Sequence, residues 1–105
     1  MNDLKKKLLL RANLLEKNAA EITNKIVDIA SLVASVISEN GKLMFCGNGG
    51  SAAECQHMSA EYCATLDHLK PRPGIPSISL TTDSSLITAW TNDFGYKNVF
   101  SRQVE

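Results

Sequence analysis

The feature that most constrains this fold is a short apolar run that leads directly into a glycine-rich turn. The run is Lys42-Leu43-Met44-Phe45-Cys46, and the turn is Gly47-Asn48-Gly49-Gly50-Ser51. Residues 51–65 then contain good helix formers, and Ser51 is suited to be the N-cap of that helix. The order strand, glycine loop, helix is typical of a parallel α/β sheet, in which ligands gather at the carboxyl ends of the strands.

The segment before this motif is predicted to be helical. Apolar residues recur at spacings of three and four, which indicates a helical run over 4–15 and a clearer one over 22–36, ended by Asn40-Gly41. These stripes indicate either core packing or an interface with a partner helix. Their members are Leu4, Leu8, Ala12, Leu15, Ile22, Ile26, Ile29, Val33 and Val36.

The segment after the motif predicts one more strand and one more helix. Residues 75–80 form the strand candidate, residues 84–91 read as a helix, and Asn92-Asp93-Phe94-Gly95 is expected to break it. A sheet of two parallel strands cannot bury its faces and edges. We therefore expect the 105 residues to be the first half of a larger domain, or to be completed by a partner chain.

Composition excludes several classes of function. Eleven Lys and Arg balance eleven Asp and Glu, so no net charge attracts nucleic acid or an anionic membrane. The sequence contains no signal peptide and no apolar stretch that spans a bilayer, which predicts a cytoplasmic protein. The three cysteines, Cys46, Cys55 and Cys63, lack metal or redox spacing and are expected to be small buried residues.

Two groups of residues are candidates for chemistry. The backbone amides of the glycine turn, with the Asn48 amide and the Ser51 hydroxyl, favour a phosphate or polyol site, and a plain tight turn is the alternative. His57 and Glu61 are four residues apart, so they share a helix face and can chelate a metal or form a surface hydrogen bond. Glu54 and Gln56 are expected to point elsewhere.

Three further residues have less specific interpretations. Asn92 and Asp93 are predicted to follow a helix, where they either bind hydroxyls near the first loop or form an ordinary turn. Trp90 is interpreted as a core residue, with a sugar platform as the alternative. His68 is expected to lie in a solvated loop.

Several of these motifs, in order and at matching spacing, resemble the sugar isomerase (SIS) domain and within it the phosphoheptose isomerases. The resemblance runs from about residue 40 to the end, and the helical arm matches in kind. The residues that carry it are Cys46-Gly47-Asn48-Gly49-Gly50-Ser51-Ala52-Ala53, Gln56-His57-Met58-Ser59-Ala60-Glu61, Arg72-Pro73-Gly74-Ile75-Pro76 and Asn92-Asp93-Phe94-Gly95-Tyr96.

This resemblance implies a fold, a reaction and a site. The fold is a flavodoxin-like, three-layer α/β/α parallel sheet. The reaction interconverts sedoheptulose 7-phosphate and D-glycero-D-manno-heptose 7-phosphate for heptose and lipopolysaccharide biosynthesis. His57 and Glu61 are implied zinc ligands, and Glu61 is the implied catalytic acid/base. The implied substrate-binding residues are Asn48, Gly49, Gly50, Ser51, Glu61, Asn92 and Asp93.

The sequence also departs from the family pattern. Thr65 stands where the family commonly has an arginine, and the chain ends before a third strand, a phosphate loop and the Gln and His that complete the zinc site. We expect a helical arm for oligomerisation at 1–40, an incomplete SIS domain at 41–105, and no activity from this chain alone. The complete protein is expected to be a homotetramer. The rival hypothesis is a non-catalytic SIS-domain binding protein of the replication-initiator-associating type.

Overall fold

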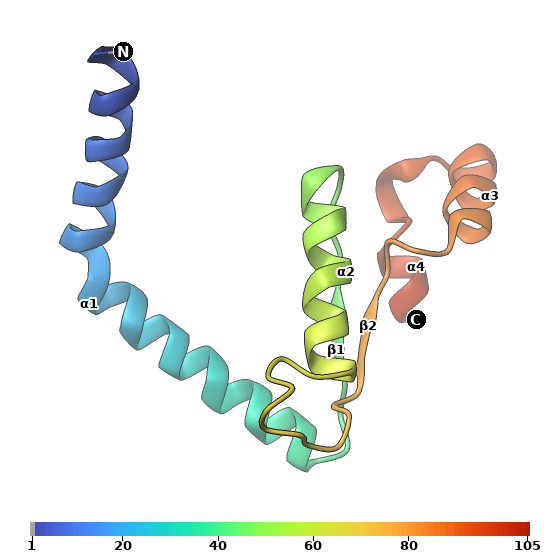
Figure 1. The fold of residues 1–105 in the computed structure, drawn as a ribbon. Helices are drawn as coiled ribbons and strands as arrows, with labels where there is room; N and C mark the ends of the chain where they lie inside the picture. Colours follow the sequence, from blue (N-terminus) through green and yellow to red (C-terminus); the bar gives the residue numbers. More distant parts are fainter. Residues whose placement is uncertain (1) are drawn as a thin grey trace. The chain divides into compact units, whose positions relative to one another are not determined.

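The computed structural model describes residues 2–105 (Figure 1). Helices and strands alternate after a long first helix, as the sequence predicts. The elements in chain order are α1 (Asn2–Ser38), β1 (Leu43–Phe45), α2 (Gly50–Cys63), β2 (Ser77–Ser79), α3 (Ser84–Phe94), the 3-10 helix η1 (Tyr96–Asn98) and α4 (Ser101–Val104).

Helix α1 is continuous and contains both of the predicted apolar runs, 4–15 and 22–36. The intervening residues contain no Gly or Pro, and the Asn18 side chain, which favours turns, instead donates from Nδ2 to the Leu14 carbonyl at 2.7 Å. The predicted stop is confirmed. Asn40 has a φ of 62° and the Gly41 amide donates to the Val36 carbonyl at 2.8 Å, which is a left-handed C-cap.

The two strands form a parallel pair, as predicted. Leu43 lies opposite Ser77, and Phe45 lies opposite Ser79. Helix α2 is the crossover between them and runs alongside both strands (Figure 1). Because the strands are parallel, the glycine loop after β1 and the loop after β2 emerge at the same edge of the sheet.

The buried core of Val36–Glu105 lies between the sheet and its helices. Among the described residues, Cys55 of α2, Leu80 after β2 and Val99 are the buried hydrophobic side chains, and Val99 is only 1% exposed. Cys46 and Cys63 are exposed, so the prediction that all three cysteines are buried holds for Cys55 alone. Both lie at the end of an element: Cys46 is the first residue after β1, and Cys63 is the last residue of α2.

Helix α3 is longer than predicted. Asp83 caps its first turn, where the carboxylate accepts from the Leu86 amide at 2.9 Å. The helix continues to Phe94, so Asn92 and Asp93 lie inside it, not after it. The stop is Gly95, whose φ of 83° is a conformation that suits glycine. Trp90 is half-buried and its ring contacts Phe94 at 4.4 Å between centroids.

Candidate functional site

The glycine loop joins the end of β1 to the start of α2. A side chain at Gly47 would place its Cβ 2.8 Å from the Ser51 Cβ, so only glycine allows this close approach. Gly49 has a φ of 57° and is the N-cap of α2. The prediction that Ser51 is the N-cap is therefore wrong: Ser51 lies within the first turn, because the glycine at 49 accommodates the left-handed entry to the helix.

This loop has the geometry of an anion or polyol site. The first amides of a helix have no partner within the helix, and the positive end of the helix dipole lies there. The turn is held from within, since the Asn48 carbonyl accepts from the Ser51 amide at 3.0 Å. The side chains of Asn48 and Ser51 are exposed beside these amides.

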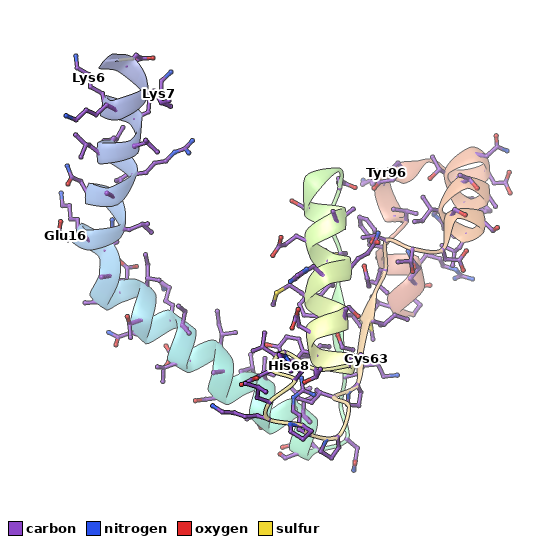
Figure 2. The ribbon with its side chains drawn as sticks, viewed as in Figure 1. Lys6, Lys7, Glu16, Cys63, His68 and Tyr96 are labelled. Carbon is purple, nitrogen blue, oxygen red and sulfur yellow. The ribbon has the colours of Figure 1, made fainter. Side chains whose placement is uncertain are left out.

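The Asn48 side chain contacts a residue to which the sequence analysis gave no role. Its Oδ1 accepts a hydrogen bond from the hydroxyl of Tyr96, the first residue of η1. Figure 2 shows Tyr96 beside the N-terminal end of α2. The chain that follows α3 therefore returns to the glycine loop, which a local sequence pattern could not reveal.

Asn92 and Asp93 lie on the last turn of α3, a few residues before Tyr96. Both are exposed, and Asn92 Nδ2 donates to Asp93 Oδ1 at 2.9 Å. The structure thus brings these two side chains together, and the segment that carries them approaches the glycine loop through Tyr96.

His57 and Glu61 share one face of α2, as their spacing predicts. The distance from His57 Nε2 to Glu61 Oε1 is 3.4 Å, and the Glu61 side chain is 28% exposed whereas that of His57 is 67% exposed. The second carboxylate oxygen of Glu61, Oε2, is buried and has no hydrogen-bond partner among the described residues. Trp90 Nε1 and Thr91 Oγ1 are buried without a partner in residues 2–105 as well. Such atoms are uncommon in folded proteins, and a bound water, ion or ligand can supply the partner.

The pair lines a hollow of about 290 Å³ on this face of α2. Glu54 lies in the same hollow, so the expectation that it points elsewhere is wrong: seven residues before Glu61, it is two helical turns away on the same face. Gln56 does point elsewhere, and its Nε2 donates to Thr81 Oγ1 at 3.3 Å. No group of three or more His, Cys, Asp or Glu side chains among residues 2–105 is arranged to hold a metal ion.

Arg72 fixes the end of the helix that bears Glu61. Its guanidinium donates to the Glu61 carbonyl at 2.7 Å and to the Tyr62 carbonyl at 2.9 Å. These carbonyls belong to the last turn of α2, where a cation also complements the helix dipole. Arg72 is thus a second residue that the sequence analysis quoted without a role.

A parallel strand pair with a glycine loop between β1 and α2, and a His/Glu pair on α2, is the arrangement expected of sugar isomerase domains. Comparison with known families agrees, because residues 11–105 match the SIS domain. The chain belongs to the SIS domain family.

The particular relatives are proteins named phosphoheptose isomerase. One from Roseiflexus sp. (strain RS-1) is 51% identical over 80 residues, which cover 76% of this chain and 40% of that protein. One from Chlorobium phaeobacteroides is 46% identical over 98 residues, which cover 93% of this chain and 43% of that protein.

Solved structures give the same result. A phosphoheptose isomerase from Neisseria gonorrhoeae superposes with a TM-score of 0.69 at 32% identity, over 96% of this chain and 53% of that one. A phosphoheptose isomerase from Francisella tularensis superposes with a TM-score of 0.81 at 27% identity, over 98% of this chain and 51% of that one. The SIS-type fold is thereby confirmed, and the chain spans about half the length of the relatives it matches.

None of the helices in residues 2–105 combines the length and the apolar character that a membrane crossing requires.

Proposed function

We propose that the complete protein is an aldose-ketose isomerase that converts sedoheptulose 7-phosphate to D-glycero-D-manno-heptose 7-phosphate, for heptose and lipopolysaccharide biosynthesis. The similar proteins named phosphoheptose isomerase support this proposal. The observation that carries it in the structure is the Glu61 carboxylate, which has a buried, unpartnered oxygen on the helix that follows the glycine loop.

The substrate binds through the glycine loop in this proposal. The amides of Gly49 and Gly50 and the side chains of Asn48 and Ser51 donate to phosphate or hydroxyl oxygens at the positive end of α2, while the Ser51 amide closes the turn onto the Asn48 carbonyl. Asn92 and Asp93, on the segment that returns to this loop, bind sugar hydroxyls.

Glu61 is the proposed acid/base. Isomerisation removes a proton from one of the two carbons C1 and C2 and returns a proton to the other, while a proton also passes between their oxygens. A carboxylate that is mostly shielded from water, with one oxygen buried, is suited to hold that proton without exchanging it rapidly with solvent.

The donor set also fits a zinc ion. A neutral imidazole and a carboxylate are common zinc ligands, and the unpartnered Glu61 Oε2 is the kind of atom that a cation satisfies. His57 and Glu61 would hold the ion, with further ligands from residues outside 2–105. A bound zinc ion would polarise the substrate carbonyl as a Lewis acid.

We also propose that the complete protein is a homotetramer, in which the apolar stripe of α1 is buried between subunits. Leu4, Leu8, Leu15, Ile26 and Ile29 are each about 60% exposed. An amphipathic helix with so much exposed apolar surface is stabilised when a second helix covers it. The cytoplasmic location expected from the sequence stays a prediction.

The test is turnover of sedoheptulose 7-phosphate by the full-length protein, with zinc and with a chelator. We expect zinc-dependent formation of the aldose, and we expect Glu61→Gln to lower kcat by at least about 100-fold, the contribution typical of a general acid or base. The control is Glu54→Gln, which changes a carboxylate in the same hollow and should retain most activity. Absence of aldose formation in zinc would refute the proposal and favour the non-catalytic binding protein.

A further inference from the structure

The hydrogen bond between Tyr96 and Asn48 joins two parts of the site that are 48 residues apart in the chain. The phenol hydroxyl donates and the carboxamide oxygen, Oδ1, accepts. An asparagine carboxamide has one acceptor atom and one NH2 group with two donors. With the oxygen engaged by Tyr96, the orientation of the amide is set and Nδ2 is the atom left for a ligand.

Contacts on both sides of Tyr96 hold its backbone and its ring in place. Its carbonyl accepts from the amide of Val99, the most deeply buried side chain among the described residues, at 3.1 Å. The Tyr96 ring meets the Phe100 ring edge to face, at 6.0 Å between centroids. Gly95, with a φ of 83°, turns the chain away from α3 just before Tyr96. These contacts hold the Tyr96 ring, which is 46% exposed, where its hydroxyl reaches Asn48.

We propose that Tyr96 is a positioning residue that holds Asn48 as a hydrogen-bond donor toward the phosphorylated sugar. This inference rests on the proposed function. A phosphate monoester is mostly a dianion at pH 7, so its oxygens accept hydrogen bonds and do not donate them. An amide held with its NH2 group toward the ligand therefore binds it. Without the Tyr96 hydroxyl, the exposed carboxamide rotates freely and also presents its oxygen, which repels the anion.

The proposal predicts a change in substrate binding that depends on Asn48. In the full-length protein, Tyr96→Phe should raise KM for sedoheptulose 7-phosphate about 3- to 10-fold, the worth of one oriented hydrogen bond, with kcat changed less than about 2-fold. Asn48→Ala should raise KM at least as much. In the Asn48→Ala background, Tyr96→Phe should have no further effect, because the two changes remove the same interaction.

The matched control is Asn98→Ala, which alters an exposed side chain on the same 3-10 turn and should leave KM unchanged. Equal effects of Tyr96→Phe with and without Asn48 would overturn the proposal, since the hydroxyl would then act by another route. An unchanged KM in Tyr96→Phe would also overturn it.

A second measurement separates this proposal from the proposed function. The Asn48 side-chain NH2 signals in a nitrogen-15 spectrum should shift when inorganic phosphate is added, and Tyr96→Phe should reduce that shift at least about 2-fold. If the protein fails to isomerise the heptulose phosphate, the proposed function is refuted and this spectrum alone decides the role of Tyr96. Equal phosphate-induced shifts in both proteins would exclude that role.

Discussion

Replacement of Arg72 tests how the helix that bears Glu61 is held in place. The guanidinium donates three hydrogen bonds, to the carbonyls of Glu61 at 2.7 Å, Tyr62 at 2.9 Å and Pro73 at 3.0 Å. Two of these acceptors lie in the last turn of α2, whose carbonyls have no partner within the helix. Arg72→Ala removes all three bonds together with the favourable interaction between the cation and the helix dipole.

The expected loss can be worked from these contacts. A hydrogen bond to a charged group contributes about 1.5–3 kcal/mol when its partners are shielded from water. Arg72 is half-buried, and the bond to Pro73 is exposed, so water replaces part of what is lost. We therefore count the Glu61 and Tyr62 bonds at the lower end of that range and expect Arg72→Ala to lower the free energy of unfolding by about 2–4 kcal/mol.

The assay is urea denaturation of the full-length protein, followed by circular dichroism, with the slope checked for each variant. Lys70→Ala is the matched control, because it removes an exposed cation from the same connector. The free energy of unfolding of Arg72→Lys should fall between those of Arg72→Ala and Lys70→Ala. A lysine ammonium keeps the charge but lacks the planar guanidinium that donates to two carbonyls at once. A free energy of unfolding for Arg72→Ala within about 0.5 kcal/mol of that for Lys70→Ala would refute the reasoning.

Two further substitutions test the connector and the start of α3. Gly74→Ala places a Cβ 2.7 Å from the backbone oxygen of Cys63 and should lower the free energy of unfolding, measured by thermal unfolding, by about 1–3 kcal/mol. Gly50→Ala is the control, because a Cβ at Gly50 meets no atom within 4 Å and should be tolerated. Equal melting temperatures for the two variants would contradict the clash. Asp83→Ala removes the cap on the Leu86 amide and should cost about 1 kcal/mol, while Asp83→Asn should retain most of that stability in the same measurement. A loss as large in Asp83→Asn would show that charge, not capping, matters there.

Local sequence signals were sufficient for most of the backbone. The apolar periodicity of residues 22–36, the Asn40-Gly41 stop and the glycine loop each specify a conformation through the residues themselves. The parallel pairing of β1 and β2 also follows from the sequence, because two strands connected by a crossover helix pair in parallel. The pairing of His57 with Glu61 was predictable for the same reason, since helix geometry alone places them on one face.

Element boundaries depended on weaker signals. Asn92 and Asp93 were expected after α3, as both residues favour turns, yet the helix reaches Phe94 because Gly95 supplies the stop. Ser51 was expected to cap α2, yet Gly49 takes that position since it tolerates a positive φ. In each case a glycine, not a polar side chain, determined where the helix begins or ends.

The sequence by itself determined the SIS-type order of elements, the glycine loop between β1 and α2, and the His57/Glu61 face of α2. Only the tertiary structure decided which distant groups meet: Tyr96 with Asn48, and Arg72 with the carbonyls at the end of α2. The physical reason is that a helix, turn or strand is set by neighbours within a few residues, whereas side-chain contacts between distant residues depend on the path of the whole chain. The interactions that orient the candidate site belong to this second kind.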